Sequence, residues 1–172
     1  MQIFGGLGNQ MFQYAAGRAL ASFYDIELAL DISFFAAHGG YTPRNFGLDV
    51  FNIDVRVATD LGIREHTYGK LREQFDRFTK PWYRRKIVYE PYFHFAADVF
   101  KGSGDTYYKG HWQSPKYFAR IQNEIRKDFS LKKPLSTEAQ TIAEKIKEFG
   151  GSSVSVHIRL GDYVSSKNVQ DT

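Results

Sequence analysis

Two short stretches of the chain combine residue types that can do chemistry, and the first lies close to residue 1. Residues 5–9 read GGLGN and run directly into a segment whose apolar residues recur at helical spacing. Glycine lets a backbone approach a ligand closely, and the N-terminus of a helix offers unpaired N–H groups with a partial positive charge. Neither common nucleotide-binding pattern is met: the P-loop lysine is absent, and the G-x-G-x-x-G pattern that begins at Gly6 meets Met11 in place of its third glycine. The stretch predicts either a weakly anion-attracting loop or a plain strand-to-helix turn.

The second stretch is VSVHIRLGDYV, residues 154–164. On a strand, His157 and Arg159 point to the same face. A guanidinium at the end of a buried strand needs an anionic partner, and its planar fork matches phosphate oxygens. Gly161 then permits a turn that leads to Asp162. The alternative is structural: Arg159 pairs with Asp162, and His157 is a satisfied core histidine.

Several other chemistries are excluded or disfavoured by what the chain lacks. It has no cysteine, which excludes disulfides, thiolate metal sites and cysteine nucleophiles. It has no D-x-D, no H-E-x-x-H and no G-x-S-x-G sequence. We therefore expect neither a bound metal nor a serine nucleophile.

Composition sets the broad class of protein. The chain has 172 residues, 42% of them hydrophobic, and a net charge of +4. This favours one soluble globular domain, and the mildly basic charge suits an anionic ligand or a weak membrane-surface contact but is not the balance of a dedicated nucleic-acid binder. The longest apolar runs fall far short of the ~18 residues of a membrane span. The basic cluster KPWYRRK, residues 80–86, is either a solvated face or a peripheral contact with anionic lipids.

The elements that must position these stretches begin with a βαβ unit. Residues 2–4 suggest a short strand, Asn9 an N-cap, residues 10–23 a helix, and residues 26–30 a second strand. Such a unit predicts a parallel sheet. Because the first strand is so short, it is either an edge strand or the remainder of a chain that begins earlier.

Further along, periodicity and capping residues predict several more elements. Ser114 is expected to cap one helix, and Thr137 with Gln140 to form the capping box of another. The expected helices are 58–64, 114–129 and 137–149, and the expected strands are 86–90, 106–112 and 154–160.

Four stretches together resemble glycosyltransferase family 11, the α-1,2-fucosyltransferases, and especially its bacterial members. They are GGLGNQMFQYAAGRALA (5–21), RNFGLDVFNI (44–53), YKGHWQSPKYF (108–118) and SVHIRLGDYV (155–164). The chain departs from the family in two respects. Leu160 stands where a second arginine is usual, and members normally continue well beyond the arginine motif.

The resemblance implies an α/β, Rossmann-like parallel sheet that forms the N-terminal half of a GT-B-type glycosyltransferase. Residues 1–150 would be the acceptor-side domain, and residues 151–172 the first strand and loop of an otherwise missing donor-binding domain. The implied reaction is inverting and metal-independent, needs no cofactor, and moves L-fucose from GDP-β-L-fucose to the 2-OH of a galactose-type glycan. This chain by itself is expected to be inactive.

The resemblance also implies roles for the residues of the arginine motif. Arg159 would bind the β-phosphate of the donor, with His157 orienting it or touching the donor itself. Asp162 would hold the fucose or act as the general base.

On the opposite side of the cleft, the resemblance implies that Gly6, Gly8 and Asn9 form a lip that touches the diphosphate or the sugar. Trp112 and Gln113 would line the acceptor site, although Trp112 fits a plain core position equally well.

Two other identities stay open. One is a non-catalytic sugar- or nucleotide-binding remnant that lacks the donor half. The other is a relative of the protein O-fucosyltransferases, against which GHWQSPKYF argues. The expected partners are GDP-fucose and a glycan acceptor, with no nucleic acid, and the expected location is the cytoplasm or the inner face of the membrane.

Overall fold

A computed structural model describes residues 1–36, 44–67 and 69–156 of the chain. The described residues fall into two compact units, 1–36 with 44–132, and 133–156. In the first unit the helices are α1 (Leu7–Tyr24), α2 (Asp60–His66), α3 (Lys70–Thr79) and α4 (Gln122–Asp128). Its strands are β1 (Ala29–Leu30), β2 (Arg56–Val57), β3 (Ile87–Tyr89) and β4 (Tyr107–Lys109). Short 3₁₀ turns cover Ser33–Ala36, Leu48–Val50, Trp82–Arg84, Ala97–Lys101, Pro115–Tyr117 and Ala119–Ile121.

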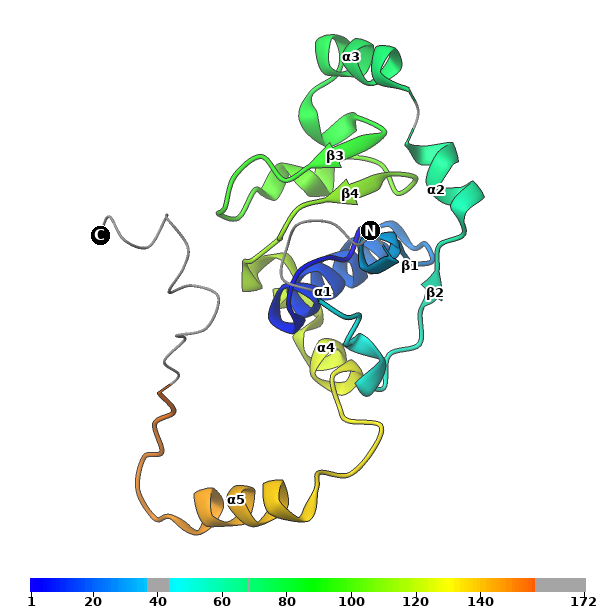
Figure 1. The fold of residues 1–172 in the computed structure, drawn as a ribbon. Coiled ribbons are helices and arrows are strands. Elements are labelled where there is room, and N and C mark those ends of the chain that lie inside the picture. The colour runs from blue at the N-terminus through cyan, green and yellow to red at the C-terminus, as the bar shows by residue number, and fades with distance from the viewer. Residues whose placement is uncertain (37–43, 68, 157–172) are drawn as a thin grey trace, which may run out of the picture. The chain divides into compact units, whose positions relative to one another are not determined.

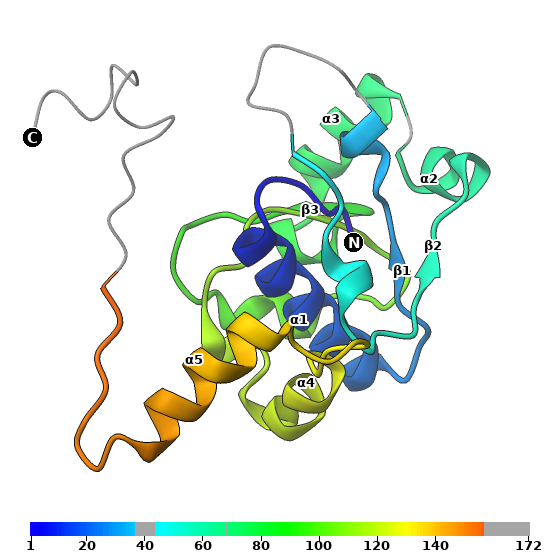
Figure 2. The same ribbon diagram turned by 60° about the horizontal axis from the view of Figure 1, so that its bottom comes forward.

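The strands of the first unit pair in parallel. In β1 and β2, Ala29 is opposite Arg56, and in β3 and β4, Ile87 is opposite Tyr107. Figure 1 shows β3 and β4 side by side, and Figure 2 shows the same for β1 and β2. The predicted parallel α/β class is confirmed at this level, as small parallel sheets in a mixed α/β fold.

Residues 1–3 join the two pairs of strands. Gln2 forms a parallel bridge with Asp31, and the N–H of Ile3 donates to the carbonyl of Asp31 at 2.9 Å. On the other side, the N–H of Gln2 donates to the carbonyl of Tyr108 at 2.9 Å. The spatial order is therefore β2, β1, residues 1–3, β4, β3. The interpretation of this strand as an edge strand is wrong, because it has a neighbour on both sides.

Helix α1 covers one face of this arrangement and supplies much of the core. Its small and apolar residues Tyr14, Ala15, Ala16 and Leu20 are almost completely buried. They belong to one cluster with side chains from the strands, among them Ile3, Leu30, Val88 and Tyr108.

Helix α1 begins earlier than its sequence suggests. Its first residue is Leu7 and its N-cap is Gly6, with no side-chain cap. The prediction of Asn9 as N-cap is wrong, since Asn9 lies in the first turn and its side chain is used elsewhere.

The predicted helix 114–129 is shorter than expected. Its first part forms 3₁₀ turns, the α-helix proper begins at Gln122, and Ser114 makes no side-chain cap. The predicted apolar stripe is nevertheless in the core cluster, through Ile125 and its partly buried neighbours Ile121 and Phe129.

The second unit contains helix α5 (Thr137–Glu148). Its N-cap is Ser136, whose hydroxyl accepts from the N–H of Ala139 at 3.3 Å, so the predicted cap is one residue out of place. Gln140 donates to the carbonyl of Leu135 at 2.8 Å. Of the predicted strand 154–160, residues 154–156 have no regular secondary structure, and the rest lies outside the described residues.

Candidate functional site

The strand order gives the first unit a switch point, the position at which the chain's progress across the sheet reverses. On one side of residues 1–3 lie β1 and then β2, which come next in the sequence. On the other side lie β4 and then β3, which come later. Open α/β sheets bind ligands beyond the carboxyl ends of the strands at such a point. Here those ends lead into residues 4–9 and residues 110–113.

A hydrogen bond links the two loops at the switch point. The amide of Gln113 donates to Oδ1 of Asn9 at 2.6 Å, across 104 positions of sequence. Asn9 comes from the predicted donor-side lip and Gln113 from the predicted acceptor site. The structure thus brings together two segments that sequence motifs selected separately.

The glycine loop owes its shape to Gly5 rather than to Gly8. Gly5 has φ +78°, and a Cβ there would lie 2.8 Å from Nδ2 of Asn9. A Cβ added at Gly6 or Gly8 would meet no atom of residues 1–36, 44–67 or 69–156 within 4 Å, and neither glycine has a positive φ. The first turn of α1 contains no acidic residue, and Gly6 makes no side-chain cap, so no carboxylate of that turn offsets the positive end of the helix dipole.

Two buried glutamines hold the loop in place. The amide of Gln10 donates to the carbonyl of Gly5 at 3.0 Å and to that of Asn45 at 2.9 Å, while its oxygen accepts from the N–H of Gly47 at 2.9 Å. Gln13 accepts from the N–H of Phe4 at 3.0 Å. Sequence reasoning missed both residues, although two glutamines three positions apart on an otherwise apolar helix face are a signal that could have identified them.

A carboxylate holds the opposite loop. Oε2 of Glu90, the residue after β3, accepts from the backbone N–H of His111 at 2.7 Å and of Trp112 at 2.9 Å. Gly110 leaves room for this contact, because a Cβ there would lie 2.3 Å from Cβ of Glu90. Trp112 is held at φ +55°, the left-handed region, which is uncommon for an aromatic residue.

The indole of Trp112 is completely buried. It packs edge-on against Tyr108 and Tyr117, with ring centroids 6.1 and 5.4 Å away. Its Nε1 has no hydrogen-bond partner among the described residues. The structure therefore places this ring in the core, which is the alternative that the sequence left open.

Aromatic side chains surround the switch point. The ring of Phe4 contacts those of Phe34 and His111, with centroids 5.9 and 4.9 Å away, and Phe93 lies 6.2 Å from His111. Phe93 is 84% exposed, and Tyr92 beside it stacks on a histidine. Exposed ring faces beside amide side chains form a surface suited to the apolar face and hydroxyls of a sugar.

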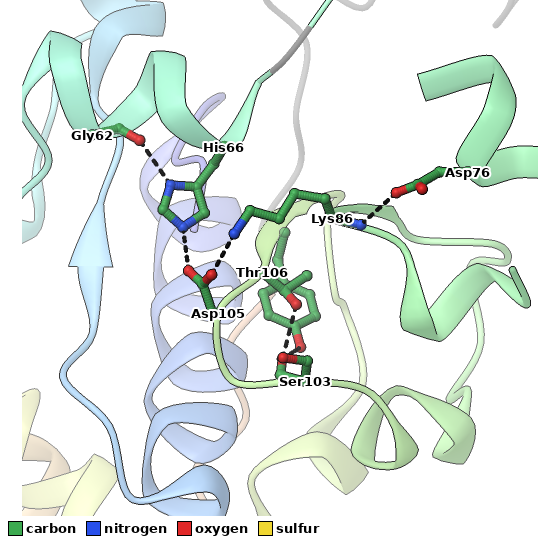
Figure 3. Close-up of polar contacts among 8 residues, drawn as sticks. Gly62, His66, Asp76, Lys86, Ser103, Asp105 and Thr106 are labelled. Atoms are coloured by element: carbon green, nitrogen blue, oxygen red, sulfur yellow. Dashed lines mark hydrogen bonds and ion pairs between the residues drawn. The ribbon is translucent and has the colours of Figure 1, made fainter. Parts of the chain in front are cut away.

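A separate cavity of about 510 Å³ lies at the opposite, amino-terminal ends of the strands, lined in part by Ala29, Asp105 and Tyr107. Several of its polar groups already have partners: His66 binds Asp105, and Nη1 of Arg56 lies 3.7 Å from Oε2 of Glu27. Figure 3 shows His66 and Lys86 reaching Asp105 from two sides, with Nε2 of His66 2.5 Å from Oδ1 of Asp105. We therefore take the switch point as the better candidate site.

The buried tyrosines of the first unit are unsuited to acid–base catalysis near neutral pH. Burial raises the pKa of Tyr107 and Tyr14 far above the usual value, and hydrogen bonds to Asp31 and Asp128 respectively raise it further. Among residues 1–36, 44–67 and 69–156 there is no group of three or more histidine and carboxylate side chains that could hold a metal. His157, Arg159 and Asp162 lie outside the described residues.

Comparison with known proteins supports the motif-based interpretation. The chain is 33% identical to the α-1,2-colitosyltransferase of Escherichia coli over 175 aligned positions, which include 94% of this chain. The same alignment includes 54% of the E. coli protein, so the chain spans about half the length of the curated relative that it matches. No protein-family profile and no solved structure matches the chain. The chain is therefore homologous to part of an α-1,2-glycosyltransferase, which agrees with the resemblance of its motifs to glycosyltransferase family 11.

Proposed function

We propose that this chain is the acceptor-side half of an inverting α-1,2-fucosyltransferase-type enzyme with a GT-B architecture. Residues 1–150 would form a Rossmann-like domain, and the strand that carries Arg159 would begin the donor-binding domain. The donor would be GDP-β-L-fucose or a closely related 6-deoxyhexose nucleotide, and the acceptor a galactose-type glycan.

In the proposed reaction, the 2-hydroxyl oxygen of the acceptor attacks the anomeric carbon of the donor from the face opposite the diphosphate. The new C–O bond forms as the bond to the β-phosphate oxygen breaks, and the electron pair leaves with GDP. The hydroxyl proton passes to a general base, for which Asp162 is our candidate. Arg159 would stabilise the charge that develops on the leaving phosphate, in the place that a metal ion takes in other enzymes.

The observation that carries the proposal is the hydrogen bond between Asn9 and Gln113. It lies where parallel α/β folds bind their ligands, and it joins the first and third of the motifs that resemble the family. Gly6 and Gly8 would leave the start of α1 accessible to a diphosphate or sugar, since a Cβ added at either glycine meets no atom of the described residues within 4 Å. We assign no sugar contact to the buried ring of Trp112 and propose Gln113 as the acceptor contact of that loop.

The identity of the donor sugar can be tested directly. L-Colitose is the 3-deoxy form of L-fucose, so the two nucleotide sugars differ by one hydroxyl group. A site that hydrogen-bonds this hydroxyl discriminates strongly against the sugar that lacks it, whereas an apolar site discriminates weakly. Transfer rates with GDP-fucose and GDP-colitose on one galactoside would distinguish the two specificities.

The experiment that tests the function is a transfer assay on the protein extended to its natural full length. Arg159→Ala should lower kcat/KM by at least ~100-fold, because a charge-assisted contact made to the leaving group is lost in the transition state. Arg159→Lys should recover little, since the planar fork is lost. The exposed Arg120 provides the control: Arg120→Ala should leave kcat/KM unchanged. A full rate in Arg159→Ala would contradict the assignment.

Gly8 offers a second test that separates stability from activity. Gly8→Ala should stabilise the fold by up to ~0.5 kcal/mol, because the residue is helical and the added methyl group meets no atom in the described part of the chain. If the donor approaches Gly8, the same change should nevertheless raise KM. An unchanged KM would indicate that the loop is only a connector.

Metal independence is the third part of the proposal. Activity should survive an excess of chelator, because Arg159 and backbone N–H groups would carry the leaving-group charge. A strict requirement for Mg²⁺ or Mn²⁺ would overturn this chemistry.

A further inference from the structure

Helix α3 turns its apolar side away from the protein. Leu71, Phe75 and Phe78 are 84%, 65% and 96% exposed, and their spacing places them on one face of the helix. The residue of this helix that is buried is Asp76, at 5% exposure. A surface helix ordinarily buries its apolar stripe and exposes its charges, and here the arrangement is reversed.

Polar contacts fix the helix in this orientation. Asp76 binds Nζ of Lys80 at 2.9 Å and accepts from the backbone N–H of Lys86 at 3.3 Å, a contact drawn in Figure 3. The guanidinium of Arg77 lies 5.5 Å from the ring of Tyr89 on strand β3. Rolling the apolar face inward would break these contacts and bury charged side chains, so the outward stripe belongs to the folded state.

Hydrogen bonds from a basic side chain also fix the C-terminal end of α3. Arg85 donates to the carbonyl of Arg77 at 3.1 Å and to that of Lys80 at 3.2 Å. Carbonyls at the end of a helix have no partner within the helix, and a basic side chain suits the negative end of its dipole. The helix and the following basic segment therefore form one structural element, which stands at the top of Figure 1.

This part of the chain contains the protein's excess positive charge. Residues 64–86 hold eight lysines and arginines against three aspartates and glutamates, a net charge of +5. The whole chain carries +4, so all the remaining residues together sum to −1. Trp82 and Tyr83, which are partly buried, lie within the same segment. Basic residues around exposed aromatic and aliphatic side chains are the composition of a helix that lies in a membrane interface.

We propose that α3 and residues 80–86 dock this protein on the surface of an anionic lipid bilayer. The stripe of Leu71, Phe75 and Phe78 enters the boundary between headgroups and acyl chains, and the surrounding lysines and arginines contact the headgroups. No helix in the described part of the chain is long and apolar enough to cross a membrane, so the contact is peripheral.

Charge favours a lipid surface over a second copy of the chain. A symmetric dimer through this face would bring two surfaces of net charge +5 together, which is unfavourable. An anionic bilayer supplies the complementary charge and an apolar layer at the same surface. The inference does not depend on the proposed transferase activity.

Sedimentation with vesicles tests the proposal on the 172-residue chain. We expect binding to phosphatidylcholine vesicles that contain phosphatidylglycerol, weaker binding as salt is raised, and little binding to phosphatidylcholine alone. The double variant Phe75→Ser/Phe78→Ser should weaken the binding by more than about 10-fold, and Arg84→Gln by about 5-fold. A matched control on α5, Ile142→Ser/Ile146→Ser, removes two side chains that are 58% and 54% exposed and should change nothing.

A second measurement tests the same contact if the double variant folds poorly. Phe78→Trp places an indole at the most exposed position of the stripe, and its fluorescence should shift to the blue when anionic vesicles are added. Circular dichroism checks that each variant is folded.

Four results would overturn the proposal. They are absence of binding to anionic vesicles, equal binding to phosphatidylcholine alone, equal loss of binding in the α5 control, and no fluorescence shift in Phe78→Trp. A dimer in lipid-free solution that Phe78→Ser dissociates would assign the stripe to a second copy instead.

Discussion

Replacing Gln10 by leucine should unfold the protein far more readily, although the change nearly conserves side-chain volume. Gln10 is 1% exposed, and its amide makes three hydrogen bonds with the backbone of two separate loop segments. Leucine fills the same space but leaves the carbonyls of Gly5 and Asn45 and the N–H of Gly47 without partners.

The size of the effect follows from those three groups. A buried backbone group that loses its partner costs about 1–3 kcal/mol, and the lower end is appropriate here because loops can open to water. Three groups therefore give about 3 kcal/mol, against a total stability of roughly 5–15 kcal/mol. For a chain of this length, the melting temperature should fall by roughly 6–12 °C.

Equilibrium unfolding in urea measures this directly. We expect the midpoint for Gln10→Leu to fall with the slope unchanged, since the surface exposed on unfolding is the same. Gln122→Leu on the exposed start of α4 is the matched control and should lie within about 0.5 kcal/mol of the parent. A loss below about 1 kcal/mol for Gln10→Leu would refute the inference that this residue holds the glycine loop.

Three further changes test other parts of the structure. Gly5→Ala should cost about 1–2 kcal/mol by urea unfolding, because φ +78° disfavours a side chain; an unchanged midpoint would contradict the left-handed conformation. Glu90→Ala should cost about 2 kcal/mol by leaving two N–H groups unpaired, whereas Glu90→Gln keeps an acceptor oxygen and should cost less; equal losses would argue against this role. Hydrogen bonds from Lys86 and His66 lower the pKa of Asp105, so its carboxylate stabilises the fold above pH ~4 and ceases to do so as the pH falls through the lowered pKa. Thermal unfolding of Asp105→Asn should thus show a loss of at most ~1 kcal/mol at neutral pH that disappears in acid; a loss that persists in acid would exclude this explanation.

Helix α1 and strands β3 and β4 can be predicted from the sequence, because residues that are neighbours in the sequence determine them. The apolar spacing that follows the glycines predicts α1, and the β-branched and aromatic residues around Val88 and Tyr108 predict β3 and β4. The sequence misplaces the start of α1 because Asn9 is a good N-cap by type, whereas its side chain instead accepts a hydrogen bond from Gln113.

The contacts that build the site cannot be read in this way. The pairing of Asn9 with Gln113 depends on the order of strands in the sheet, which no local pattern encodes. The structural roles of Gln10 and Glu90 depend on which backbone groups a distant loop leaves without partners. Helix α3 is not among the predicted helices, although Leu71, Phe75 and Phe78 have helical spacing; what no local pattern encodes is that this face points away from the core.

The central position of residues 1–3 has a consequence for how the chain folds during synthesis. These residues are synthesised before both of their partner strands. β1 follows within about 30 residues and can pair with one side of them early, but β4 on the other side is made about 100 residues later. At a synthesis rate of roughly 5–20 residues per second, that side stays unpaired for roughly 5–20 seconds. During this interval the nascent chain presents an open strand edge to its neighbours on the polysome. Its yield in cells should therefore depend on chaperones that cover this edge until β4 emerges, and slower translation should lower the yield.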